Sequence, residues 1–133
     1  MHRDIKPANV FLMRPNDLSS LKIGDFGLAL ACEPWQQKSE RAGSPYYVAP
    51  EVLSQNFSQG ADLWSCGVLL FYALSGYHPF TGGSMDAIFR QIMLGRPDMA
   101  HGEGARQWGR VSKEAKALVR RLLTKARGAR FVL

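Results

Sequence analysis

Two short clusters near the start of the chain carry side chains that could move a phosphoryl group. They contribute Arg3, Asp4, Lys6 and Asn9, followed by Asp25-Phe26-Gly27. Asp25 lies 21 residues beyond Asp4. Phosphoryl transfer requires a protein mainly to position a hydroxyl, to hold Mg²⁺ and to neutralise phosphate charge. The clusters supply a carboxylate base, an ammonium group and two oxygen ligands, so they predict a site of this kind.

A third cluster, Ala49-Pro50-Glu51, follows Gly27 at a distance suited to an activation loop. The order His-Arg-Asp, Asp-Phe-Gly, Ala-Pro-Glu is the signature of protein kinases. From Met1 to about Phe131 the chain therefore resembles a serine/threonine protein kinase. The resemblance implies that residues 1–133 form a partial kinase domain, truncated at both ends and without the N-terminal lobe. The implied fold is a mainly α-helical C-terminal lobe with a short β-hairpin.

The resemblance implies a role for each residue of the first two clusters. Asp4 would be the catalytic base, and Lys6 would counter charge on the phosphoryl group of ATP. Asn9 and Asp25 would bind Mg²⁺ and, through it, ATP, because amide and carboxylate oxygens suit this cation. Gly27 would give the backbone the freedom to aim Asp25. In isolation Asp4 would be a solvated loop carboxylate, but its neighbours favour the catalytic role.

Control of the site is expected to involve the activation segment. By the family pattern, Arg3 faces that segment and attracts an anionic group, either Glu40 or phosphorylated Ser39. Ser44 stands where the family usually has Thr, and its hydroxyl could contact the catalytic residues. The pocket for the residue after the phosphorylated one would be formed by Tyr46, Tyr47 and Val48.

Three further residues are expected to be structural. Glu51 resembles one member of a buried ion pair whose partner would be Arg130, although two unrelated surface charges are the alternative. Losing one member of a buried pair costs roughly 3–5 kcal/mol. Asp62 would accept hydrogen bonds from the catalytic-loop backbone and fix the shape of that loop.

The kinase subgroup is suggested by two stretches and by a tryptophan. The stretches Gly60–Leu70 and Leu74–Phe80, with Trp108 ahead of Val111–Lys116, are similar to calcium-dependent and calcium/calmodulin-dependent kinases. No EF-hand pattern is present to indicate direct calcium control. The expected partner is a protein substrate with a Ser or Thr acceptor, and its identity stays open.

Two kinase elements are missing from the sequence. None of the 13 glycines forms a G-x-G-x-x-G segment, and no V-A-I-K-like strand supplies the phosphate-holding lysine. We therefore expect residues 1–133 alone to bind ATP poorly and to be inactive. The alternative is a non-catalytic interaction module derived from a kinase lobe, whose partner would be a regulatory segment or the missing lobe.

Composition restricts the location and the class of protein. The 46% hydrophobic content excludes a disordered chain, and no stretch approaches the roughly 18 apolar residues of a membrane span. Met1 stands directly before a charged motif, so we expect no signal peptide, no membrane partner and a location in the cytoplasm or nucleus. Cys32 and Cys66 lack metal-ligand spacing and are expected to be reduced thiols.

The net charge of +6 is unevenly distributed. Residues 1–89 hold 6 basic and 8 acidic side chains, and residues 90–133 hold 11 and 3, which gives −2 and +8. A basic tail can bind nucleic acid. Here the basic residues lie on an amphipathic helix with little aromatic interleaving, so a solvated face is favoured over a nucleic-acid partner.

Hydrophobic periodicity predicts the elements that must position these residues. Val10–Met13 and Leu21–Ile23 flank a turn and predict a hairpin, and residues 28–48 suit a loop. Ala61–Ser75 is apolar on nearly every side and predicts a helix that is buried all round. One-sided helices are predicted after the caps Ser84 and Ser112. They are separated by a predicted loop between Arg96 and Arg110, with Trp108 as its anchor.

Overall fold

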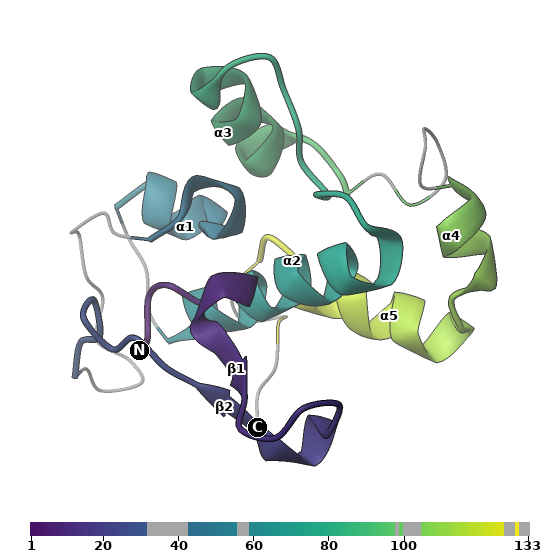
Figure 1. Ribbon diagram of the computed structural model, residues 1–133. Helices are drawn as coiled ribbons and strands as arrows, with labels where there is room; N and C mark the ends of the chain where they lie inside the picture. Colours follow the sequence, from purple (N-terminus) through teal and green to yellow (C-terminus); the bar gives the residue numbers. More distant parts are fainter. Residues whose placement is uncertain (32–42, 56–58, 98, 100–104, 127–129, 131–133) are drawn as a thin grey trace.

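The computed structural model describes residues 1–31, 43–55, 59–97, 99, 105–126 and 130. In these residues a two-stranded antiparallel sheet precedes a set of helices, as the sequence predicted (Figure 1). The strands are β1 (Val10–Leu12) and β2 (Leu21–Ile23). The helices are α1 (Pro50–Leu53), α2 (Gly60–Ser75), α3 (Met85–Leu94), α4 (Ala105–Arg110) and α5 (Lys113–Leu122). No helix in these ranges is long and apolar enough to cross a membrane.

The hairpin places the two catalytic clusters beside each other. Val10 pairs with Ile23 and Leu12 with Leu21, so the residues before β1 and after β2 meet at one end of the sheet. The backbone N–H of Gly24 donates to Asn9 O at 3.0 Å and closes that end. At the other end, the Asp17 side chain accepts from Ser19 N and caps the 3₁₀ turn Leu18–Ser20. The hairpin register thus brings Asn9 close to Asp25.

Helix α2 runs through the middle of the molecule and carries most of its core (Figure 1). Trp64, Val68 and Phe71 recur at helical spacing and are fully buried. Leu63, Leu69 and Leu70 are only half-buried, so the expectation that this helix is buried all round is wrong for the structure described. In the part of the chain that the structure describes, α2 packs against α4, α5 and the 3₁₀ turn Pro45–Tyr47.

Helices α3 and α5 begin at the serine caps that the sequence predicted. Ser84 Oγ accepts from Ala87 N at 3.2 Å, and Ser112 Oγ accepts from Ala115 N at 3.1 Å. Such caps satisfy N–H groups that have no partner within the helix. Helix α5 approaches α2 closely at Gly67, where a Cβ atom would lie 2.7 Å from Leu122 Cβ. Glycine therefore sets the distance between these two helices.

The segment between Arg96 and Arg110 is not entirely a loop, because it contains α4. Six residues are too few to show a helical period, so composition suggested irregular structure. The anchoring role predicted for Trp108 is confirmed, since its side chain is buried with its ring centroid 4.7 Å from that of Phe71. Packing of this one side chain holds α4 against α2.

Candidate active site

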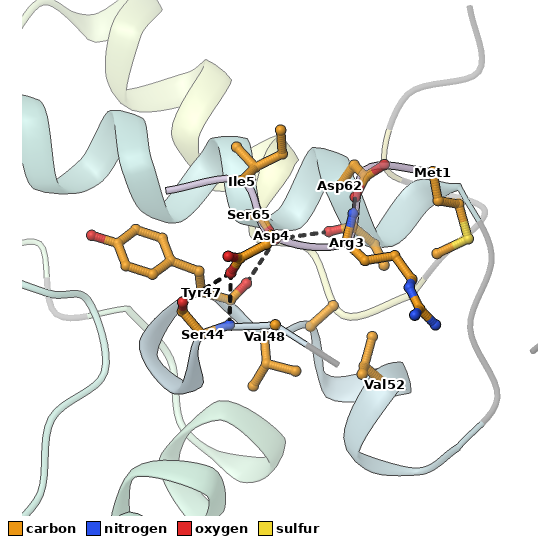
Figure 2. A pocket seen from close by; sticks show the side chains of 13 residues that line it. Met1, Arg3, Asp4, Ile5, Ser44, Tyr47, Val48, Val52, Asp62 and Ser65 are labelled. Carbon is orange, nitrogen blue, oxygen red and sulfur yellow. Dashed lines mark hydrogen bonds between the residues drawn. The ribbon is translucent and has the colours of Figure 1, made fainter. Parts of the chain in front are cut away.

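The carboxylate of Asp4 lies at the centre of the site, and nearly all of it is buried (Figure 2). Oδ1 accepts from Ser44 N at 3.0 Å and from Ser44 Oγ at 2.8 Å, while Oδ2 lies 2.7 Å from Lys6 Nζ. Burial by itself raises the pKa of Asp4, but hydrogen bonds from Lys6, Ser44 and Asn9, with the Lys6 charge, lower it below the usual value. Asp4 is therefore an ionised hydrogen-bond acceptor at neutral pH.

Lys6 and Ser44 complete a small polar triangle with Asp4. Lys6 Nζ donates to Ser44 Oγ at 2.9 Å, so one serine hydroxyl contacts both the carboxylate and the ammonium group. Ser44 lies near the end of the activation segment, 40 residues from Asp4 in the sequence. The contact that the sequence suggested for its hydroxyl is thus present in the structure.

Asn9 is buried and oriented by the same carboxylate. Its amide nitrogen donates to Asp4 O at 2.8 Å and to Asp4 Oδ2 at 3.2 Å. Because both hydrogens of the amide are used on Asp4, Oδ1 is the atom that Asn9 can offer to a cation. The 3₁₀ turn Pro7–Asn9 directly before β1 holds the residue in this position.

Asp25 is exposed and has a left-handed backbone, with φ 60°. This conformation is uncommon outside glycine, and such strain is concentrated at functional sites. Gly27 N donates to Asp25 Oδ1 at 3.2 Å. Gly27 itself has no positive φ, so the expectation that it supplies backbone freedom is wrong. Its missing side chain instead provides space, since a Cβ would lie 3.2 Å from Asp25 Oδ1.

The donor set of Asn9 and Asp25 fits Mg²⁺. Both offer oxygen atoms, which this hard cation prefers, and it commonly takes one or two protein ligands with phosphate and water completing the octahedron. In the ranges that the structure describes, no group of three His, Cys, Asp or Glu side chains could hold a metal alone. The pair therefore suits a metal ion that arrives with a nucleotide.

The catalytic loop is fixed to α2 by Asp62. Its Oδ2 accepts from His2 N at 2.7 Å. Its Oδ1 accepts from Arg3 N at 2.9 Å (Figure 2). Two backbone bonds to one carboxylate hold the loop firmly. The sequence analysis did not single out His2. Its ring also connects the catalytic loop to the end of the hairpin, since Nε2 lies 3.0 Å from Gly24 O and Nδ1 accepts from Asp4 N.

Arg3 is directed toward the start of the activation segment. Its Nε donates to Leu28 O at 2.7 Å, and its backbone has φ 71°. The two residues predicted to interact with it, Ser39 and Glu40, lie outside the described residues, as does Cys32. Their regulatory role stays a prediction.

Gly43 is a further functional position that the motif analysis missed. Its φ is +105°, and a Cβ built there would lie 2.5 Å from Arg3 O. The end of the activation segment thus passes so close to the catalytic loop that only glycine fits. A glycine directly before Ser44 was the available signal, but which backbone it approaches could not be read from the sequence.

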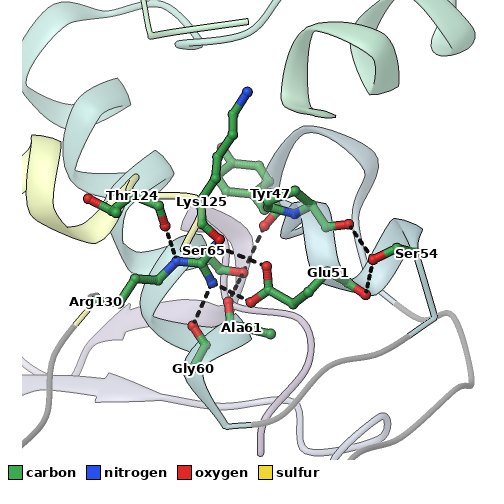
Figure 3. A network of polar contacts seen from close by, with 10 residues as sticks. Tyr47, Glu51, Ser54, Gly60, Ala61, Ser65, Thr124, Lys125 and Arg130 are labelled. Carbon is green, nitrogen blue, oxygen red and sulfur yellow. Dashed lines mark hydrogen bonds and ion pairs between the residues drawn. The ribbon is translucent and has the colours of Figure 1, made fainter. Parts of the chain in front are cut away.

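Glu51 and Arg130 form a buried, two-pronged ion pair (Figure 3). Arg130 Nη1 donates to Glu51 Oε1, and Nη2 donates to Oε2 at 2.9 Å. The same guanidinium donates to Thr124 O and Gly60 O and lies over the ring of Trp64, 4.9 Å from its centroid. Arg130 is only 1% exposed, so the pair joins the segment after α5 to the start of α1 inside the core.

Comparisons with known proteins agree with this geometry. The protein kinase domain model matches residues 1–132. Serine/threonine-protein kinase PEPKR2 of Arabidopsis thaliana is 47% identical over 131 residues, which is 98% of this chain and 26% of that protein. Calcium-dependent protein kinase SK5 of Glycine max is 44% identical over 92% of this chain and 23% of its own length. The chain therefore spans about a quarter of these relatives.

Proposed function

This chain belongs to the protein kinase domain family, and on that premise we propose that it supplies the catalytic residues of a serine/threonine protein kinase. The reaction is transfer of a phosphoryl group from ATP to a Ser or Thr hydroxyl of a protein. The activity requires a complete kinase domain, by which we mean residues 1–133 joined to an upstream half that carries the Gly-rich loop and the phosphate-holding lysine.

One observation carries this proposal. The Asp4–Lys6 pair already holds a serine hydroxyl, since Ser44 Oγ lies 2.8 Å from the carboxylate and 2.9 Å from the ammonium group. A substrate Ser or Thr presents the same group to the same pair. The four acceptor positions of the Asp4 carboxylate are taken by Ser44, Lys6 and Asn9, so a substrate hydroxyl binds by replacing one of these bonds.

In the proposed mechanism Asp4 accepts the hydrogen bond of the acceptor hydroxyl and orients its oxygen. Asp4 receives the proton as that oxygen forms its bond to the γ-phosphorus of ATP, while the bond from the same phosphorus to the β-phosphate oxygen breaks and ADP leaves. Lys6 then shifts toward the phosphoryl oxygens and neutralises their charge. Asn9 and Asp25 would hold Mg²⁺, which supplies positive charge on the phosphate oxygens when it is bound. Asp62 keeps the loop in place through His2 and Arg3.

The test is phosphoryl transfer to a serine peptide by the complete kinase domain. Asp4→Asn should reduce kcat by about 10²–10⁴-fold because the general base is lost. Asp25→Ala should remove the Mg²⁺-dependent turnover while the thermal transition is retained, since Asp25 is exposed. Asp17→Asn, in the exposed turn of the hairpin, is the matched control and should transfer normally. Wild-type turnover in Asp4→Asn would refute the assignment.

A second candidate, a non-catalytic interaction module, is favoured by one observation. The hairpin and the segment after it expose eight large apolar side chains, which are Phe11, Leu12, Met13, Leu18, Leu21, Ile23, Phe26 and Leu28. Exposed apolar patches of this kind mark interaction surfaces. If residues 1–133 fold as a stable monomer and show no transferase activity, the interaction module is favoured over the catalytic function. The predicted inactivity of the isolated chain and its location in the cytoplasm or nucleus stay predictions.

A further inference from the structure

A cluster of two cations lies where helix α3 ends, and none of its residues belongs to the candidate active site. Lys125, from the segment after α5, donates from Nζ to Met93 O at 2.9 Å and to Gly95 O. Met93 lies in the last turn of α3, where the carbonyl groups have no partner within the helix. Since a cation is favoured at this end of a helix, Lys125 stabilises α3 and joins it to the segment after α5.

The position of Lys125 is fixed by the buried ion pair of Glu51 and Arg130. Arg130 Nη2 donates to Lys125 O at 3.4 Å, and the Lys125 side chain points away from that pair (Figure 3). An ammonium group has three N–H donors, and two of them are used on the carbonyl groups at the end of α3. The third has no protein acceptor among the described residues, so it is available to a ligand.

The second cation is Arg96, which is exposed and lies two residues beyond the end of α3. Burial lowers the pKa of Lys125, and the neighbouring charge of Arg96 lowers it further. Among the described residues, neither cation forms an ion pair with a carboxylate. Stabilisation of α3 explains Lys125 but not Arg96, whose charge repels that of Lys125. An anion between the two would offset this repulsion.

Both cations line a cavity of about 290 Å³ whose other walls are largely apolar. The lining residues are Leu94, Gly95, Arg96, Pro97, Leu123 and Lys125. Leu94 is 79% exposed, whereas Leu123 is buried, so the apolar lining extends from the protein surface inward. Pockets for whole small molecules usually measure roughly 300–1,000 Å³. A cavity of this size therefore suits one or two side chains better than a nucleotide or a lipid.

We propose that this cavity binds an acidic segment of a partner protein, in which an Asp or Glu side chain lies beside a large apolar one. The carboxylate accepts from Arg96 and from the third N–H of Lys125, and the apolar side chain covers Leu94. A nucleic acid would use the two cations and leave the apolar wall in water, so the lining favours a peptide. The inference goes beyond the proposed function, because no residue of the cavity takes part in phosphoryl transfer.

The experiment titrates the isotope-labelled complete kinase domain with short peptides that carry Leu-Glu-Leu, Leu-Gln-Leu or Gly-Glu-Gly at their centre. With Leu-Glu-Leu, the backbone NMR signals of Gly95, Arg96 and Lys125 should shift. Leu-Gln-Leu should bind roughly tenfold more weakly, because hydrogen bonds to a charged group contribute more than neutral ones. Gly-Glu-Gly should also bind roughly tenfold more weakly, a usual value for a lost apolar contact.

Two variants test the two kinds of contact separately. Arg96→Gln should remove most of the preference for Glu over Gln, and the thermal transition should be retained because Arg96 is exposed. Leu94→Ala should reduce the preference for Leu-Glu-Leu over Gly-Glu-Gly, since it removes the exposed apolar wall. Arg90→Gln is the matched control: it removes the same charge from an exposed position of α3 outside the cavity and should bind all three peptides as the wild type does.

Absence of the signal shifts, or equal binding of Leu-Glu-Leu and Leu-Gln-Leu, would overturn the inference. Equal losses in Arg90→Gln and Arg96→Gln would also overturn it, because net charge alone would then explain the attraction. Equal binding of Leu-Glu-Leu and Gly-Glu-Gly would replace the peptide site by a site for any small anion. Lys125→Met should act as Arg96→Gln does, and if it fails to fold, Arg96→Gln decides. Binding is measured without ATP, so the outcome is independent of phosphoryl transfer.

Discussion

The helices around α2 and the β-hairpin differ in how far their apolar side chains are buried. In the helical region Trp64, Val68, Phe71 and Ile92 are fully buried. In the hairpin Leu18 is 77% exposed, and both strands consist of half-buried or exposed residues. The hairpin nevertheless carries Asn9 and Asp25 at its end. The helical region therefore buries most of its large apolar side chains, whereas the hairpin, which carries the two proposed metal ligands, exposes most of its own.

The two regions therefore fix different residues of the proposed site. The base and its partners are fixed by bonds to the helical region, through Asp62 and Ser44. The proposed metal ligands, Asn9 and Asp25, depend on the hairpin, and a two-stranded sheet is only marginally stable by itself. In the proposed function, the residues that would orient the acceptor hydroxyl are thus fixed by the described fold, while nucleotide binding would also depend on a segment that covers the hairpin.

The largest expected effect is a loss of stability when the buried Glu51–Arg130 pair of the helical region is broken. Glu51→Ala leaves Arg130 charged, buried and unpaired, and should lower the free energy of unfolding by roughly 3–5 kcal/mol. Urea denaturation followed by tryptophan fluorescence measures this, because Trp64 and Trp108 both lie in that region. The matched control is Asp17→Ala, which removes the exposed Arg14–Asp17 pair and the cap of the turn Leu18–Ser20, and should shift the transition far less than Glu51→Ala does. Similar shifts in the two variants would contradict the comparison.

An intermediate effect should separate the two kinds of apolar residue. Ile92→Ala creates a cavity in the core and should cost about 2–5 kcal/mol of stability. Leu18→Ala removes a side chain that is already in water, so it should change stability little in residues 1–133. It should instead reduce the binding of a dye specific for apolar surface. A large loss of stability from Leu18→Ala in this chain would show that the hairpin contributes to the core.

The smallest expected effect is a pH dependence from His78. Burial lowers its pKa below 6.5 in the folded state, so the unfolded chain binds a proton first as the pH falls. Its contribution to stability is therefore complete above about pH 6.5 and is lost as the pH falls from there toward the folded pKa. The difference in melting temperature between wild type and His78→Phe, followed from pH 8 to about pH 5, should grow in favour of the variant. A constant difference would exclude this titration.

The sequence by itself determined the features that depend on residue type and local spacing. The hairpin, the caps Ser84 and Ser112, and the membership in the kinase family follow from motifs and from hydrophobic periods within a few residues. A cap or a turn involves atoms only a few residues apart, so its chemistry can be read along the chain.

Only the tertiary structure decided which distant groups meet. Four features depend on contacts between separate segments. They are helix α4, the partial burial of α2, the approach of Gly43 to Arg3, and the stacking of His78 with Tyr46 and Tyr72. Those contacts are selected by close packing of whole surfaces, which no local pattern encodes. For the same reason the close approach of Asp25 Oδ1 to Gly27, which leaves little room for a side chain there, became evident only from the tertiary structure.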